Sequence, residues 1–190
     1  MSEKLATLKK EENISIITLD DGKANVFSSK MSKDINECLD EVPTENGCLI
    51  ITGREGILSG GFDLKVIQSG EIESIQEMTL AGFKLLSRIF SFPRPVIAAC
   101  SGHAVALGTF LLCCCDYRIG VKGDFMLGAN EMRTNMVIPP PILELIKFRV
   151  FCNSVILLIS IKGFGLLNVI GFNLFPYPAH KIKAVFISIF

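Results

Sequence analysis

"GHAVALGTFLLCCCDYRIG", residues 102–120, is the stretch that decides the fold of this chain. It follows the β-branched run "PVIAAC" (95–100), starts at a glycine, continues through an apolar segment from Leu107 to Cys115 and ends at "DYRIG" (116–120). The apolar segment has the length of a buried helix, and the first run has the composition of a buried strand. The sequence therefore predicts a strand, a glycine turn and a buried helix in succession.

The same alternation of strands and helices extends upstream. The runs "ISIITL" (14–19) and "CLIITG" (48–53) are predicted to be buried strands bounded by turn residues. Between them, residues 28–42 repeat apolar side chains at helical spacing, and residues 71–93 do so over a longer stretch that Pro93 ends. Strands that alternate with helices in this way indicate an α/β domain.

Charge and cysteine content narrow the class of protein. The chain has 190 residues, enough for one sizeable core, and its 19 basic residues balance 19 acidic ones, which favours a small ligand over nucleic acid. No cysteines are spaced as CxxC and three are adjacent, so we expect buried thiols in a reducing cytoplasm, without a metal site or disulfide framework. The N-terminal residues show no apolar secretory signal. The cysteines are Cys38, Cys48, Cys100, Cys113, Cys114, Cys115 and Cys152.

The composition changes near residue 150, which suggests a main domain over 1–150 and an atypical apolar tail over 151–190. The tail contains no Asp or Glu. Residues 151–175 are about long enough to cross a bilayer, but Lys162 lies in the middle and three glycines weaken a helix there. Membrane contact through this segment is therefore open but not favoured. The alternative is an aberrant tail in place of whatever normally follows.

Two glycine turns are the candidate functional elements. In "GILSGGFDLK" (56–65), Gly60 and Gly61 allow a tight turn after a predicted strand, and Asp63 is placed to cap the segment that follows. Gly102 begins the second turn, before the helix expected from Leu107. Backbone N–H groups at both turns would suit an oxyanion site. On spacing alone, two ordinary strand-to-helix loops remain the favoured interpretation.

Four stretches, in this order, resemble the crotonase superfamily of enoyl-CoA hydratases and isomerases. They are "LSGGFDLK" (58–65), "PRPVIAACSGHAVALG" (93–108), "CDYRIG" (115–120) and "FMLGANE" (125–131). The resemblance covers about residues 10–150. It implies a crotonase-like spiral of stacked ββα turns whose C-terminal helical part is missing or replaced, because nothing after Val150 matches. It also implies an acyl-CoA thioester as the substrate, with coenzyme A as part of that substrate and no separate cofactor, and a homotrimer if the C-terminus permits.

The resemblance also assigns roles by position. The N–H groups of Phe62 and Leu107 would bind the thioester oxygen, and Glu131 would transfer the proton. From the residues alone, a surface glutamate beside Arg133 is the favoured interpretation. For His103 the alternative is an ordinary hydrogen-bonded loop histidine, and for Lys23 and Lys65 it is solvated surface lysines. The further substrate contacts implied are Lys23, Ala24, Gly60, Gly61, Asp63, Leu64, Lys65, His103 and Phe110.

Phe110 decides which reaction the resemblance favours. Hydratases of this superfamily carry a second glutamate at that position, and a phenylalanine cannot orient water or carry a proton. The single-glutamate Δ3-Δ2-enoyl-CoA isomerases are similar in having an apolar residue there, so we predict isomerisation. The alternatives are a hydratase-family lyase or hydrolase of fatty acid oxidation, and a truncated, inactive acyl-CoA-binding relic.

Overall fold

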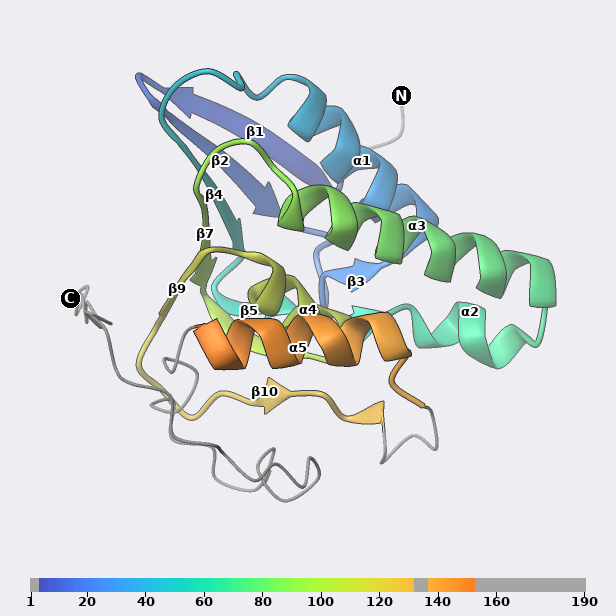
Figure 1. Cartoon of the computed structure of the whole chain (residues 1–190). Coiled ribbons are helices and arrows are strands. Elements are labelled where there is room, and N and C mark those ends of the chain that lie inside the picture. The colour runs from blue at the N-terminus through green and yellow to red at the C-terminus, as the bar shows by residue number, and fades with distance from the viewer. Residues whose placement is uncertain (1–3, 132–136, 153–190) are drawn as a thin grey trace.

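The computed structural model describes residues 4–131 and 137–152, which form three sheets and the helices that pack on them (Figure 1). The largest sheet has the strand order β1-β2-β4-β7-β9, in which β1 is antiparallel to β2 and the other neighbours are parallel. Its strands are β1 (Ala6–Glu11), β2 (Ile14–Leu19), β4 (Cys48–Gly53), β7 (Val96–Cys100) and β9 (Tyr117–Gly120).

Two smaller parallel sheets contain the strands that follow those of the large sheet. One has the order β10-β8-β5, and the other pairs β3 with β6. Their strands are β3 (Val26–Phe27), β5 (Gly56–Ser59), β6 (Gly61–Phe62), β8 (Gly102–Val105) and β10 (Leu127–Gly128).

The chain repeats one unit: a large-sheet strand, a small-sheet strand and then a helix. The first three units end in α1, in α3 after the short α2, and in α4, and the fourth continues from β9 and β10 towards α5. This arrangement confirms the predicted stacked ββα spiral. The helices are α1 (Ser29–Asp40), α2 (Leu64–Ser69), α3 (Ile72–Phe90), α4 (Leu107–Cys114) and α5 (Pro140–Cys152).

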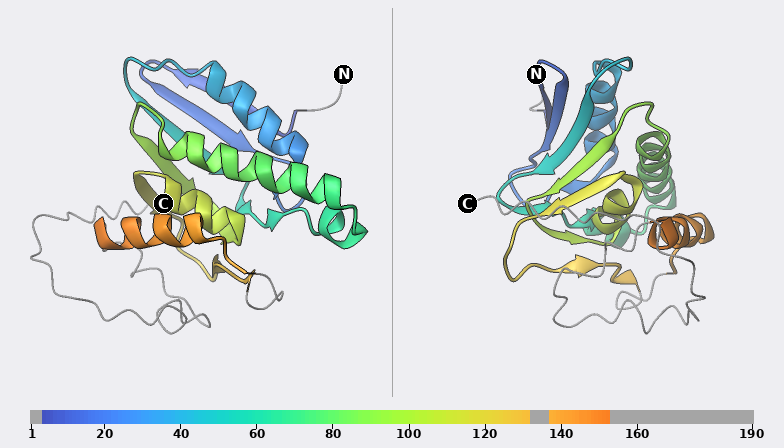
Figure 2. Two further views of the ribbon diagram at one scale, coloured as in Figure 1. Left: turned by 45° about the vertical axis from the view of Figure 1, so that its right-hand side comes forward. Right: turned by 60° about the vertical axis from the view of Figure 1, so that its left-hand side comes forward.

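The elements α1, α3, β2, β4 and β7 lie where the sequence predicted them, but the strands are buried on one face only. Along β2, Ile17 and Leu19 are fully buried, whereas Ile14 is 39% exposed. The reason is visible in Figure 2, where α1 and α3 lie on the same side of the five-stranded sheet. Side chains on that side enter the core, and those on the other side are half-buried or exposed.

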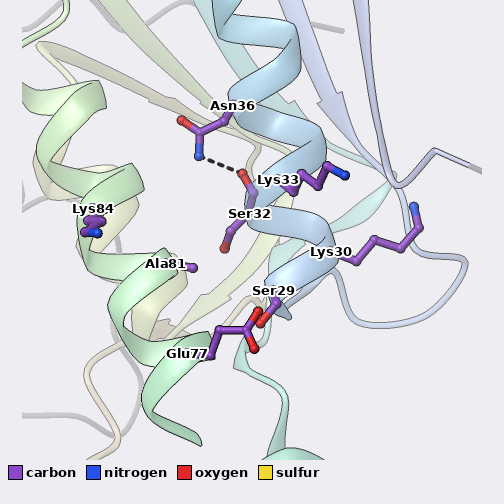
Figure 3. A pocket seen from close by; sticks show the side chains of 8 residues that line it. All are labelled: Ser29, Lys30, Ser32, Lys33, Asn36, Glu77, Ala81 and Lys84. Atoms are coloured by element: carbon purple, nitrogen blue, oxygen red, sulfur yellow. Dashed lines mark hydrogen bonds between the residues drawn. The ribbon is translucent and has the colours of Figure 1, made fainter. Parts of the chain in front are cut away.

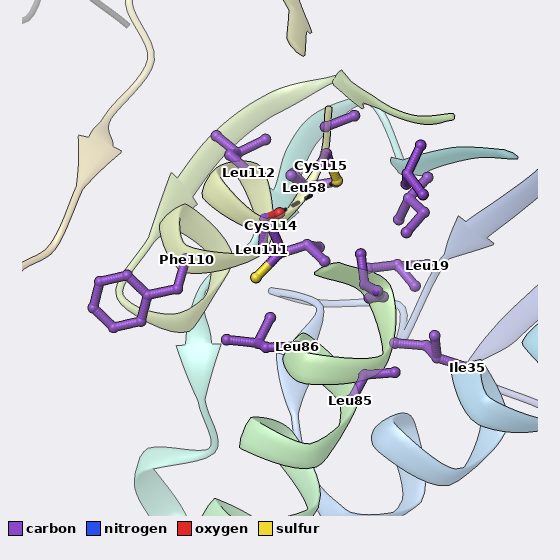
Figure 4. Close-up of a cluster of buried hydrophobic side chains, with 14 of the residues drawn as sticks. Leu19, Ile35, Leu58, Leu85, Leu86, Phe110, Leu111, Leu112, Cys114 and Cys115 are labelled. Carbon is purple, nitrogen blue, oxygen red and sulfur yellow. Dashed lines mark hydrogen bonds between the residues drawn. The ribbon is translucent and has the colours of Figure 1, made fainter. Parts of the chain in front are cut away.

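The core lies between this sheet face and the helices (Figure 4). Leu85 and Leu86 of α3 contribute to it together with Leu111 of α4. The cysteine run also belongs to it, since Cys113 and Cys114 at the end of α4 and the following Cys115 are buried. None of the six cysteines whose side chains the structure describes forms a disulfide, and five are buried, which agrees with the expected thiols.

Most of the apolar tail lies outside the residues that the structure describes. The expected boundary at residue 150 lies inside α5, and residues 153–175 of the segment considered for membrane contact lie outside the described residues. Within 4–131 and 137–152, no helix has the length and apolar character that a bilayer span requires.

Candidate active site

The first glycine turn predicted from the sequence meets the start of α4. The second turn was predicted to begin at Gly102, but Gly102–Val105 forms strand β8, so the chain turns at Ala106 instead. Gly61 has a φ of +89°, and a Cβ added to it would lie 2.7 Å from the Ala106 Cβ and 3.4 Å from the Leu107 nitrogen. A side chain at this position would therefore press into the start of α4. Because Phe62 directly follows Gly61, the backbone of Phe62 lies near that of Leu107.

The start of α4 has the features of an oxyanion site. The preceding residue, Ala106, caps the helix without a side-chain hydrogen bond and has a φ of +50°, a strained conformation for a residue with a Cβ. The helix provides no acceptor for the N–H of its first residue, Leu107, and the helix dipole places partial positive charge there. This N–H is therefore suited to binding an oxygen that develops negative charge.

The side chains of Phe62 and Leu107 pack on α3. A Cβ added to Gly82 of α3 would lie 2.7 Å from Cε1 of Phe62 and 3.1 Å from Cδ2 of Leu107. The Phe62 ring also contacts Phe83 edge-on, with 5.7 Å between the ring centroids. These contacts place apolar side chains next to the two residues whose N–H groups were predicted as donors, and Phe110, one turn further along α4, is buried as well.

Hydrogen bonds attach the segment before Glu131 to the start of α4. The Ala106 N–H donates to the Gly128 carbonyl at 3.0 Å, and the Gly128 N–H donates to the Thr109 hydroxyl at 3.0 Å. Glu131 follows Gly128 by three residues, so their Cα atoms lie within about 11 Å of each other.

The carboxyl group of Glu131 is in the protein interior. Glu131 is 6% exposed, so the alternative of a surface glutamate is wrong. Burial raises the pKa of this carboxyl group, and a hydrogen bond from its own backbone N–H opposes the shift only partly. A raised pKa suits a group that must both accept and return a proton near neutral pH.

A polar loop before β3 carries residues that sequence reasoning missed. Asn25 is fully buried with a φ of +49°, and its side-chain amide donates to the carbonyls of Leu19 at 2.9 Å and Leu58 at 3.2 Å. The Gly60 N–H donates to the Ala24 carbonyl at 2.7 Å, which joins this loop to the first glycine turn. Asn25 thus fixes the loop on which the predicted Lys23 and Ala24 lie.

Asp21 organises the same loop. Its carboxylate accepts hydrogen bonds from the backbone N–H groups of Lys23, Asn25 and Val26 at 2.7 to 2.9 Å. Burial acts to raise the pKa of this carboxyl group, but the three N–H donors together with the positive charge of Arg54 outweigh it and hold the pKa below its ordinary value. The sequence signal that could have found it is the polar run "DDGKAN" (20–25) between two strands, which is typical of an Asx turn.

The remaining predicted residues lie at the periphery. Asp63 caps α2, as expected, by accepting from the Lys65 N–H at 2.9 Å. The side chains of Lys23, Leu64 and Lys65 are exposed. The imidazole of His103 accepts a hydrogen bond from the Met126 N–H at 2.9 Å and packs edge-on against Phe125. These contacts favour the interpretation of His103 as an ordinary hydrogen-bonded histidine.

A hollow between α1 and α3 is lined by none of the predicted site residues (Figure 3). Lys30 and Lys33 extend away from α3 in this view, and the Lys30 ammonium pairs with Asp34 at 2.6 Å. Among the residues that the structure describes, no three His, Cys, Asp or Glu side chains gather as metal ligands would. The residues that line the hollow are Ser29, Lys30, Ser32, Lys33, Asn36, Glu77, Ala81 and Lys84.

Comparison with known proteins identifies the family. The family model described as enoyl-CoA hydratase/isomerase matches residues 9–141, so the chain belongs to the enoyl-CoA hydratase/isomerase family. This is the crotonase superfamily that the four sequence stretches resemble.

Relatives include proteins named for both activities. A probable enoyl-CoA hydratase of Bacillus subtilis is 31% identical over 136 residues, covering 69% of this chain and 52% of the relative. An enoyl-CoA delta isomerase 3 of Arabidopsis thaliana is 28% identical over 141 residues, covering 71% and 59%. The chain thus spans between half and three-fifths of the length of these two relatives.

Solved structures share the fold. One described as an enoyl-CoA isomerase of Mycobacterium tuberculosis is 36% identical, with a TM-score of 0.71, over 76% of this chain and 62% of that one. An enoyl-CoA hydratase/isomerase family protein of Pseudomonas syringae is 40% identical, with a TM-score of 0.70, over 74% and 61%. These names leave the choice between hydration and isomerisation to the residues of the site.

Proposed function

We propose that this chain isomerises 3-enoyl-CoA thioesters to 2-enoyl-CoA thioesters, with Glu131 as the proton carrier and the N–H groups of Phe62 and Leu107 as the oxyanion donors. The observation that supports the proposal best is the approach of the first glycine turn to the start of α4, where a Cβ added to Gly61 would lie 3.4 Å from the Leu107 nitrogen. The substrate class is inferred from the family to which the chain belongs.

In the proposed reaction the Glu131 carboxylate removes a proton from C2 of the 3-enoyl thioester. The electrons move into a dienolate whose oxygen accepts hydrogen bonds from the Phe62 and Leu107 N–H groups. The carboxylic acid formed on Glu131 then returns its proton at C4, which leaves the double bond between C2 and C3. Proton transfer in both directions is easiest for a carboxyl group with a raised pKa, as burial gives Glu131.

The apolar surroundings favour this reaction over hydration. Hydration requires a polar group that holds and activates water, and Phe110, whose position in hydratases carries the second glutamate, is a buried hydrocarbon here. Phe62 and Leu107 add further apolar surface beside the two donors. Exclusion of water strengthens hydrogen bonds to the dienolate and protects it from other reactions.

The test is proton exchange at C2 by the full chain in D2O, with a 3-enoyl-CoA as substrate. We expect the parent protein to form 2-enoyl-CoA, with deuterium entering when the Glu131 carboxylic acid exchanges its proton with solvent before it protonates the dienolate, and the Glu131→Gln variant to lose about 100- to 10,000-fold in rate. Glu144→Gln is the matched control, because Glu144 is an exposed residue of α5 that pairs with Lys147.

Two outcomes would contradict the proposal. Hydration of 2-enoyl-CoA without conversion of 3-enoyl-CoA would assign a hydratase instead. If the parent and the Glu131→Gln variant bind acyl-CoA equally well and neither exchanges the C2 proton, the chain is an inactive binding protein. Trimer formation and a cytoplasmic location stay predictions, which sedimentation and cell fractionation would test.

A further inference from the structure

We infer that Ser59 is a positioning residue that sets the direction of the Phe62 N–H and its spacing from the Leu107 N–H. The inference rests on the proposed function, which did not use Ser59. Ser59 is the last residue of β5, immediately before the first glycine turn, and it is fully buried.

The hydroxyl group of Ser59 connects two backbone segments. It donates a hydrogen bond to the Asn25 carbonyl at 2.7 Å and accepts one from the Gly61 N–H at 3.1 Å. Asn25 is itself held by the Leu19 and Leu58 carbonyls, so the hydroxyl group is oriented by a fixed acceptor. The Gly61 N–H is thereby tied to a rigid part of the fold.

Ser59 also contacts the second turn. A Cβ added to Gly108 would lie 2.7 Å from the Ser59 carbonyl oxygen and 2.9 Å from the Ser59 Cβ. The first turn of α4 therefore rests directly on Ser59. One residue thus touches both turns, next to Phe62 through Gly61 and next to Leu107 through Gly108.

The conformational freedom of glycine explains why such an anchor is needed. Gly61 adopts a φ of +89°, and without a Cβ it has many other conformations open to it. The peptide group between Gly61 and Phe62 carries the proposed donor N–H, so a change at Gly61 would turn that donor away from the oxyanion. The hydrogen bond to Ser59 selects one orientation before substrate binds.

The experiment compares the full-length parent with Ser59→Ala and Ser59→Cys. We expect Ser59→Ala to lower kcat for C2 exchange about 10- to 100-fold, with KM changed less than about threefold, since misaimed donors weaken transition-state binding most. Ser59→Cys keeps a weak donor and acceptor and should fall between the two. Ser101→Ala is the matched control. The Ser101 hydroxyl also donates to a carbonyl of β5, that of Ile57 at 3.2 Å, but among the described residues it has no hydrogen bond to Gly60 or Gly61 in the first glycine turn.

A spectroscopic measurement separates this inference from the proposed function. The infrared carbonyl band of a bound 13C-labelled acyl-CoA thioester should move to lower frequency in the parent and back towards the free value in Ser59→Ala. This readout works without turnover, so a parent that shows the shift but no exchange contradicts only the proposed reaction. Equal bands and equal kcat in the parent and Ser59→Ala would overturn the role of Ser59, as would the same loss in Ser101→Ala.

Discussion

Replacement of Gly82 by alanine should disturb the candidate site from outside it. The added Cβ would lie 2.7 Å from Cε1 of Phe62 and 3.0 Å from its Cζ, whereas ordinary contact begins at 3.4 Å. The ring edge must therefore move by about 0.7 Å, and the T-shaped contact with Phe83 limits where it can go.

Two opposing effects set the expected stability. Overpacking of this kind costs about 1 to 3 kcal/mol. Alanine within a helix is favoured over glycine by about 1 kcal/mol, so we expect a net loss of about 0 to 2 kcal/mol for Gly82→Ala. Because the displaced ring belongs to the residue that carries a proposed donor, kcat for C2 exchange should also fall, by about tenfold.

A double-mutant cycle with Phe62→Ala in urea unfolding isolates the contact. With the ring removed, Gly82→Ala should approach the helix-propensity gain, which gives a coupling of about 1 to 3 kcal/mol. Ala81→Gly, one residue away on α3, measures the local propensity and serves as the control. Zero coupling, with Gly82→Ala stabilising the parent by about 1 kcal/mol, would refute the packing of Phe62 on α3.

Three further predictions concern titration and a buried arginine. Because burial raises the pKa of Glu131, the folded chain is stabilised by the neutral carboxyl group, and this stabilisation is lost as the pH rises from 4.5 through the raised value. In urea unfolding, the stability of Glu131→Gln relative to the parent should therefore increase over that range. A difference that does not change with pH would contradict this prediction. The pKa of Asp21 is lowered, so Asp21→Asn should cost about 1 to 2 kcal/mol at neutral pH, and calorimetry should show the difference vanish only as the pH falls below 3.8 through the lowered value. Arg94 is 4% exposed and donates to the carbonyls of Asn13, Pro43 and Cys48, so Arg94→Met should cost about 2 to 3 kcal/mol in thermal unfolding, whereas an unchanged midpoint would show that these bonds contribute nothing.

Apolar periodicity was sufficient to predict the elements that bury most surface. It located β2, β4, α1, α3 and α4 to within a few residues. It missed β3, β6 and β10 because two residues carry no period, and it missed β5 and β8 because these four-residue strands begin at glycines in the stretches predicted to be turns. It missed β1 because "ATLKKE" is an exposed edge strand with a charged end. It also missed α5, whose first two residues are prolines and whose apolar residues follow no clear helical stripe.

The candidate site was less accessible to sequence reasoning. Phe62 and Leu107 were selected only through a family resemblance, because nothing local shows that two turns 45 residues apart will touch. The burial of Glu131 was likewise not predicted from the residues alone, because a single glutamate shortly after a glycine carries no local pattern that distinguishes a buried site from a surface one. The bonds of Ser59 to Asn25 and of Asn25 to Leu58 join residues more than 30 positions apart, so no local pattern reveals them.

The winding of the chain has a consequence for how new activities arise on this scaffold. The two proposed donors come from the second and third coils of the spiral, and Glu131 comes from the fourth. Because β10 is held to β8 and to the start of α4, an insertion between β10 and Glu131, or a substitution of Glu131 itself, would change the acid while leaving the two backbone segments in place. If the proposed donors bind the substrate oxygen, the proton-transfer group can therefore change in evolution without rebuilding the part of the fold that holds them.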